Sequence, residues 1–206
     1  QGEGLSKRLG TLSLRDMRKE GIVPEALISL MARLGSSQPV ELQSDLAAVA
    51  EGFDLSHFGS APTKFDKDDL FPLTARYLQS LPLEAVAHAV TDAGVPEDRA
   101  DAFWTVVRDN ITTLNDLSSW WTLCSEGAEP VISAEDKDFV TEALALLPEG
   151  PFSADTWSNW TQAVKEATGR KGKSLFMPLR LALTGQAHGP DMSTLLPLLQ
   201  VIKAKT

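Results

Sequence analysis

The sequence predicts an all-α protein. Apolar residues recur at helical spacing nearly throughout, and no run of five or more residues alternates as a half-buried strand would. Glycine and proline stand where helices are expected to end or begin. With 206 residues, of which 43% are hydrophobic, the chain has enough apolar material for one sizeable domain or two small ones. We therefore expect about ten short helices and no repeat of fixed period.

In the first half of the chain, N-cap residues, prolines and glycines indicate where helices begin and end. Ser13 suits the N-cap of a helix that runs to Lys19 and ends at Gly21. Pro24 suits the first turn of the next helix, whose apolar face precedes Gly35. The apolar residues on that face are Ala26, Leu27, Leu30, Met31 and Leu34. The following segments are a short amphipathic stretch at 41–50, a connector at 52–67 and a helix at 69–80.

The second half continues the same pattern of helices bounded by proline, serine or glycine. Pro82 opens one helix that Gly94 closes, Pro96 opens another, and Ser133 and Ser153 are expected to cap two later ones. The expected helical ranges are 83–93, 97–110, 113 or 115 through 121, 134–147, 153–167, 176–183 and 192–204.

Composition and charge exclude several classes of protein. The formal net charge of −9 argues against generic nucleic-acid binding, DNA included, yet two basic islands, at 7–19 and 165–180, suit local phosphate contacts. Cys124 is the only cysteine, so an internal disulfide is excluded and the residue is expected to be packed. No apolar run reaches the roughly 20 residues that a membrane span needs, and the first ten residues do not resemble a signal peptide. We expect a reduced, cytoplasmic protein.

Other chemistries find little support in the sequence. The histidines, His57, His88 and His188, lack metal-ligand spacing, so no metal site is expected. No nucleophile turn or phosphate-cradling glycine loop between a strand and a helix is present. Two stretches stand out, 4–8 and 171–185. The first suits either a phosphate loop or a solvated lead-in to a helix; in the second, Arg180 suits either a ligand contact or a charge that complements the helix dipole.

Both stretches resemble one family. Gly4-Leu5-Ser6-Lys7-Arg8 resembles the KMSKS-type loop of class I aminoacyl-tRNA synthetases, in the KLSKR form of glutamyl-tRNA synthetases. The later stretch, with Phe176-Met177-Pro178-Leu179-Arg180, Ala182-Leu183-Thr184-Gly185 and His188-Gly189-Pro190, resembles the C-terminal signature of the bacterial glutamyl enzymes. The two matches occur in the family's order, and the resemblance spans essentially the whole chain.

The resemblance implies a C-terminal portion that begins at the signature loop. In the family this loop binds ATP, and its second lysine, matched by Lys7, stabilises charge on the phosphates while glutamate is activated; Gly4 replaces the first lysine. The family's HIGH-type motif is absent, so the chain alone is expected to be inactive and to hold no cofactor. The full-length enzyme would use ATP and Mg²⁺ to form glutamyl-adenylate and charge tRNA(Glu), with tRNA(Gln) as a further candidate.

The resemblance also implies which residues meet the tRNA. Arg180 matches an arginine that contacts an anticodon base, and Pro190 and Met192 match positions that pack against the anticodon. Asn110 replaces the arginine of an R-x-x-T-L pattern that reads the third anticodon base, so altered selectivity between the two tRNAs is expected. Backbone contacts are expected from the basic residues before the last signature, which are Arg170, Lys171 and Lys173.

The implied organisation has three parts: a signature loop and stem-contact region at 1–68, a first helical anticodon-binding subdomain at 69–125, and a second at 126–206. A monomer without membrane association is expected. Two alternatives stay open. The chain could be a helical protein-interaction module that does not bind tRNA, or a stand-alone paralogue that serves a related synthetase in trans.

Overall fold

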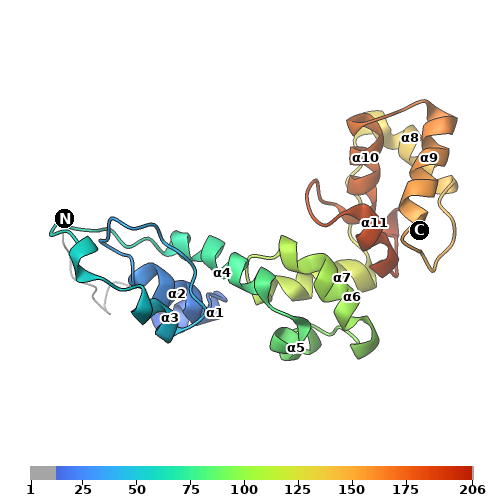
Figure 1. The fold of residues 1–206 in the computed structure, drawn as a ribbon. Helices are drawn as coiled ribbons and strands as arrows, with labels where there is room; N and C mark the ends of the chain where they lie inside the picture. Colours follow the sequence, from blue (N-terminus) through green and yellow to red (C-terminus); the bar gives the residue numbers. More distant parts are fainter. Residues whose placement is uncertain (1–12, 206) are drawn as a thin grey trace. The chain divides into compact units, whose positions relative to one another are not determined.

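The computed structural model describes residues 13–205 and confirms the all-α prediction (Figure 1). Within that range, β-structure is limited to one isolated bridge between Ser36 and Phe58. The α-helices are α1 (Leu14–Lys19), α2 (Pro24–Met31), α3 (Leu46–Glu51), α4 (Leu70–Ser80), α5 (Leu83–Asp92), α6 (Glu97–Val107), α7 (Leu117–Glu126), α8 (Lys137–Ala145), α9 (Thr156–Thr168), α10 (Lys173–Thr184) and α11 (Met192–Leu195). The 3₁₀ turns are η2 (Leu55–His57), η3 (Lys67–Asp69), η4 (Arg108–Asn110), η5 (Leu114–Asp116), η6 (Ala134–Asp136), η7 (Leu196–Leu198) and η8 (Lys203–Lys205).

The chain divides into two compact units. The first contains the described residues up to Val86 together with Ile111–Asp116, and the second contains Ala87–Asn110 and the chain from Leu117 onward. A hydrogen bond ties the inserted segment to the first unit, since the side-chain amide of Asn115 donates to the Lys19 carbonyl over 3.0 Å. The expected divisions at 68/69 and 125/126 do not coincide with these two units.

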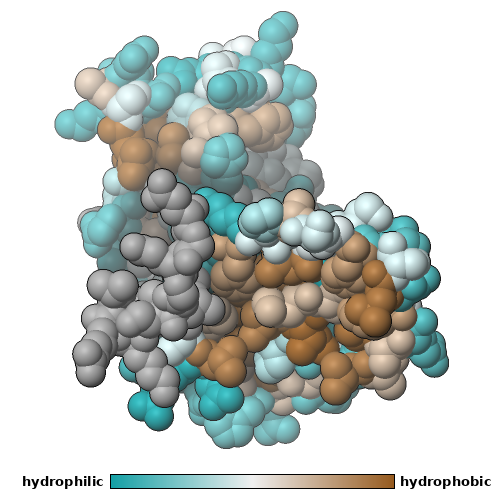
Figure 2. All heavy atoms as spheres, turned by 90° about the vertical axis from the view of Figure 1, so that its left-hand side faces the viewer, coloured by the Kyte–Doolittle hydropathy of each residue, from teal (hydrophilic) through white to brown (hydrophobic). Residues whose placement is uncertain are grey.

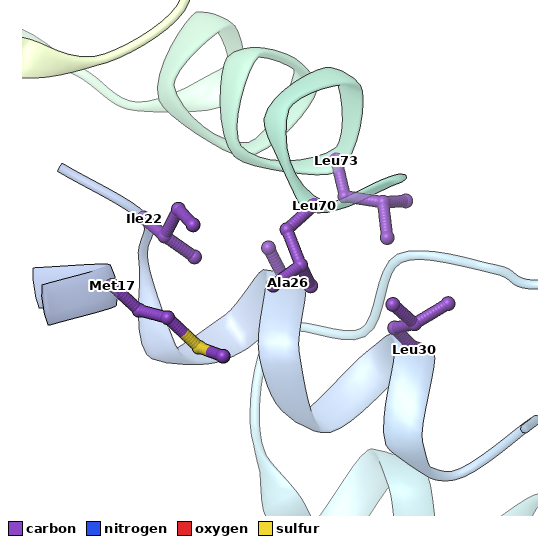
Figure 3. Close-up of a cluster of buried hydrophobic side chains, with 6 residues drawn as sticks. All are labelled: Met17, Ile22, Ala26, Leu30, Leu70 and Leu73. Carbon is purple, nitrogen blue, oxygen red and sulfur yellow. The ribbon is translucent and has the colours of Figure 1, made fainter. Parts of the chain in front are cut away.

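The core of the first unit forms where α1 and α2 pack against the start of α4. Figure 3 shows the buried side chains converging between these helices. They are Met17, Ile22, Ala26, Leu30, Leu70 and Leu73. An ion pair between Lys67 and Glu20, 2.5 Å apart, lies beside this cluster and links the turn before α4 to the end of α1. α4 thus belongs structurally to the first unit, although the expected stem-contact region ended just before it.

The segment between α2 and η3 exposes much of its apolar surface. α3 has the sequence LAAVAE, yet none of its residues is buried. Figure 2 shows brown, apolar surface on the first unit. Exposed large apolar residues of this unit include Met31, Leu46, Phe53 and Leu55. The expected amphipathic stretch at 41–50 is helical only in its second half: α3 begins after the N-cap Asp45, whose carboxylate accepts from the Ala48 amide.

The second unit buries the larger aromatic side chains. Phe103, Trp104 and Val107 of α6 pack with α7, where Phe103 and Trp121 meet edge to face with ring centroids 5.5 Å apart. Later in the unit, α8, α9, α10 and α11 pack together (Figure 1). None of the helices in residues 13–205 has the length and apolar character needed to cross a membrane.

Two expected helix boundaries differ from the structure near the C-terminus. α10 begins at Lys173 rather than Phe176, because Gly172 takes the N-cap position and Leu175 is buried. The expected helix at 192–204 is α11 followed by 3₁₀ turns. Pro197 lacks an amide hydrogen to continue the α-helix. The Gln200 amide instead donates to the Cys124 carbonyl over 2.7 Å, so tertiary contacts replace helical ones.

Cys124 gives a first testable prediction. The side chain lies fully buried in α7, and burial raises the pKa of its thiol to about 12, with the Arg99 charge acting weakly in the opposite direction. Because the thiolate is the reactive form, we expect the folded protein to resist alkylation at about pH 8 and to react after unfolding in denaturant. Mass spectrometry after iodoacetamide treatment measures this. Rapid labelling of the folded chain would contradict the buried placement.

Candidate nucleic-acid interface

A cavity of about 400 Å³ lies in the second unit beside Arg180. It is built from α9, α10 and the segment that leads into α11. Its lining residues are Trp157, Phe176, Arg180, Gly189, Pro190, Asp191 and Met192. Phe176 and Arg180 are one helical turn apart on α10, so their side chains share a face of that helix. The 186–190 loop closes the cavity because Gly185 ends α10 and Asp191 caps α11.

Arg180 is only partly satisfied by the protein. Its Nη1 donates to the Pro190 carbonyl over 2.9 Å. Its Nε and Nη2 are buried and have no hydrogen-bond partner. Burying an unpaired donor costs free energy, and such groups are rare in folded proteins outside functional sites. The two free N–H groups form one edge of the guanidinium fork, which can donate to a pair of adjacent acceptors.

The electrostatic setting of Arg180 favours an acceptor from outside the protein. Burial lowers the pKa of the Arg180 guanidinium, and the charge of Asp191 opposes that shift. Hydrogen bonds from Ser193 lower the pKa of Asp191 first of all, with a smaller contribution from Arg180. Within residues 13–205, no carboxylate forms an ion pair with Arg180. The cation is therefore hydrogen-bonded to a carbonyl and only partly compensated by the charge of Asp191.

Gly189 lies close to the side chains of Arg180 and Trp120. Its φ of +142° falls in a region that favours glycine. A Cβ at this position would be 2.5 Å from Nη2 of Arg180 and 2.8 Å from Cη2 of Trp120. Trp120 is nearly buried in α7, so it cannot easily move aside. The missing side chain of Gly189 thus leaves room for the Arg180 guanidinium.

Two residues of the cavity were not singled out from the sequence. Trp157 and Phe176 line the cavity with ring centroids 6.3 Å apart. The five tryptophans of the chain leave room for one or two rings at a binding surface, but the sequence does not indicate which. The helical spacing between Phe176 and Arg180 was an available signal. The pairing of Trp157 with Phe176 was not, because it depends on how α9 packs against α10.

The other expected anticodon residues fall in different places. Pro190 and Met192 do line the cavity, but Pro190 is buried and Met192 is only 5% exposed, so they form its wall. Asn110 is exposed at the end of η4 and is not part of the cavity. Its neighbour Arg108 has a buried Nε without a hydrogen-bond partner. The structure brings three of the four expected residues together and leaves Asn110 apart.

The three basic residues around the start of α10 differ in whether their side chains contact other residues of the protein. Arg170 lies over the Phe139 ring, 4.0 Å from its centroid, and pairs with Asp136 over 2.5 Å. It also donates to the Ser174 carbonyl over 3.3 Å, which Pro178 cannot pair with because it has no amide hydrogen. Lys171 and Lys173 are exposed. Arg170 therefore stabilises the fold locally, and the two lysines are the better candidates for phosphate contacts.

This difference predicts separate effects on tRNA binding. Lys171→Ala and Lys173→Ala should each weaken binding and reduce the slope of log K against log salt concentration by about 1, as loss of a phosphate contact does. Arg170→Ala should instead lower the melting temperature, because it leaves Asp136 and the Ser174 carbonyl without their partner. Binding titrations at several salt concentrations and thermal unfolding measure the two effects. A slope change for Arg170→Ala equal to that of the lysines, with an unchanged melting temperature, would contradict this assignment.

Two further expectations concern catalysis and metals. The ATP-loop residues, Gly4, Leu5, Ser6, Lys7 and Arg8, lie outside the described residues. Among residues 13–205, no group of three or more His, Cys, Asp or Glu side chains is placed to hold a metal ion.

The fold and the cavity together define a helical domain with a partly exposed arginine–aromatic site. The family model of the anticodon binding domain matches residues 73–201, which contain the whole cavity. The chain therefore belongs to the anticodon binding domain family.

Curated relatives extend this finding over the whole chain and confirm the resemblance to glutamyl-tRNA synthetases. The chain is 70% identical over 205 residues to glutamate–tRNA ligase 1 of Ruegeria pomeroyi and 69% identical to glutamate–tRNA ligase 1 of Roseobacter denitrificans. It spans 46% of the length of each of these relatives. A crystal structure of a glutamate tRNA ligase from Elizabethkingia meningosepticum has the same fold over 96% of this chain and 46% of that chain, with a TM-score of 0.71 and 22% identity.

Proposed function

We propose that the chain binds tRNA and that the cavity at Arg180 receives a nucleotide of the anticodon loop. The observation that carries this proposal is Arg180, an arginine with two unpaired N–H groups that lines a cavity together with aromatic side chains. Unstacked bases of single-stranded loops offer the acceptors and flat faces that such a cavity suits. Lys171 and Lys173 at the start of α10 would add backbone contacts despite the acidic net charge of −9.

The whole protein is proposed to have the activity for which its relatives are named. We propose that it attaches glutamate to tRNA(Glu) in the cytoplasm, as a monomer, with ATP and Mg²⁺. In that scheme Lys7 stabilises charge on the ATP phosphates, and the rest of this chain contributes tRNA recognition rather than chemistry. The exposed Asn110, where the family carries an arginine, is proposed to relax discrimination against tRNA(Gln). Charging both tRNAs with the full-length enzyme, wild type against Asn110→Arg, tests that last point, and unchanged selectivity would contradict it.

The binding proposal is tested by titrating the 206-residue chain with a tRNA(Glu) transcript. We expect saturable binding that weakens as salt rises, and weaker binding of a duplex RNA of equal length. The alternative is a protein-interaction module, and the exposed apolar residues of the first unit favour it. Absence of tRNA binding would favour that alternative, and equal binding of tRNA and duplex RNA would contradict recognition of a single-stranded loop. Separately, ATP–pyrophosphate exchange by the 206-residue chain would contradict its assignment to recognition alone.

A further inference from the structure

We propose that Trp157 and Phe176 form a stacking surface for the base of the nucleotide that enters the Arg180 cavity. This inference rests on the proposed tRNA binding and adds a role for Trp157 and Phe176, neither of which was assigned to tRNA binding from the sequence. Both rings line the cavity, and their planes are inclined by 36° with centroids 6.3 Å apart. Ligands of the matching class are single-stranded nucleic acids with an unstacked base.

The surface is held in position by buried neighbours. Trp160, one turn along α9 from Trp157, is 2% exposed, and its indole N–H donates to the Ala143 carbonyl over 2.7 Å. Trp157 meets Trp160 edge to face, with ring centroids 5.6 Å apart and an interplanar angle of 67°. Phe176 follows the buried residue Leu175 on α10, and it lines the cavity one helical turn before Arg180. The Trp157 ring is thus fixed before any ligand arrives, which lowers the entropy cost of stacking.

Exposure separates these two rings from the other tryptophans of the unit. Phe176 is 44% exposed and Trp157 is half-buried, whereas Trp104, Trp120, Trp121 and Trp160 are all 9% exposed or less. Leaving aromatic area open to water forgoes the stabilisation that burial would bring. Both rings line the same cavity as Arg180, whose Nε and Nη2 have no hydrogen-bond partner. A base would cover the rings and accept from Arg180 at the same time.

Stacking on the two rings would supply affinity, and hydrogen bonds from Arg180 would supply selectivity among bases. Stacking is tolerant of base identity because every base has a π-face, whereas hydrogen bonds from a guanidinium distinguish base edges. Loss of an aromatic ring should therefore weaken the binding of every tRNA that places a base in the cavity, and by the same factor. It should leave the salt dependence unchanged, since no cation is removed.

The test measures tRNA(Glu) binding by Trp157→Leu and Phe176→Ala variants of the 206-residue chain. Each should bind roughly 5- to 150-fold more weakly, with an unaltered salt slope, and Trp157→Phe should recover most of the loss. A tRNA carrying 2-aminopurine at one anticodon position should show fluorescence quenching with the wild type that is reduced with Phe176→Ala. Phe152→Ala is the matched control: Phe152 is half-buried, belongs to the same unit as Phe176 and lines a different cavity.

The possible outcomes separate this inference from the function on which it rests. If Arg180→Ala weakens binding while Trp157→Leu and Phe176→Ala bind as the wild type does, the stacking surface is refuted and the tRNA proposal survives. If the wild-type chain does not bind tRNA, both fall. Circular dichroism melting of each variant confirms that a loss of binding does not reflect unfolding. A loss that Phe152→Ala reproduces would also refute the assignment.

Discussion

Arg180→Ala is expected to weaken tRNA(Glu) binding by about 1–3 kcal/mol while leaving the fold stable. The variant loses both the free N–H pair proposed to meet a base and the hydrogen bond to the Pro190 carbonyl. It also removes two buried donors that the protein leaves unsatisfied. Since these effects on the folded state oppose each other, the free energy of unfolding should change by less than about 1 kcal/mol.

Two variants sharpen this experiment. Arg180→Lys keeps a positive charge without the planar fork, so it should recover the salt-dependent part of binding but little of the base selectivity. Arg99→Ala removes an arginine of the same unit that lines a different cavity, and it should bind tRNA as the wild type does. Equal losses for Arg99→Ala and Arg180→Ala would indicate a general charge effect and would contradict a specific role for Arg180.

Gly189→Ala is expected to impair both stability and binding. The added Cβ would meet Nη2 of Arg180 and the Trp120 ring, and the residue would be strained at a φ of +142°. Strain of this kind costs about 1–3 kcal/mol of unfolding free energy. The Arg180 side chain can shift more easily than Trp120, so the guanidinium should leave its place and tRNA binding should fall about as far as with Arg180→Ala.

Gly169→Ala is the matched control for this prediction. Gly169 has a φ of +71°, but a Cβ there would have no atom within 4 Å. It should therefore show backbone strain of about 1 kcal/mol without the clash, and tRNA binding should be unchanged. Chemical denaturation and tRNA titration of the two variants measure both effects. Wild-type affinity in Gly189→Ala would show that the Arg180 geometry described above does not matter for binding.

The sequence predicted the fold class and most helices because the relevant signals are local. Ser13 accepts from the Asp16 amide as a predicted N-cap should, and Gly169 and Gly185 end α9 and α10 in left-handed conformations. The prediction of one helix at 192–204 was wrong because the apolar residues there make tertiary contacts. Helical periodicity alone does not distinguish residues with such contacts from residues on the buried face of a helix. α3 was predicted as amphipathic, yet no residue of it is buried.

The site was predictable only in part for a similar reason. Arg180 was identified by its motif, but the motif does not reveal that Nε and Nη2 lack partners. Arg170 was expected to contact tRNA because it is a cation in a basic segment. Its contacts with Asp136 and Phe139 depend on η6 and α8, where these two residues lie more than 30 residues earlier in the chain. Charge in a sequence indicates a possible contact, and only the packed structure indicates whether that charge is already paired.

The most direct measurement is a double-mutant cycle between Arg180 and the anticodon. Wild-type chain and Arg180→Ala are titrated with tRNA(Glu) and with transcripts that replace each anticodon base singly. At one position, replacing the base should weaken binding to the wild type but not weaken Arg180→Ala further, which gives a coupling energy of about 1–3 kcal/mol. Additive losses at all three positions would contradict the proposal that the Arg180 cavity reads an anticodon base.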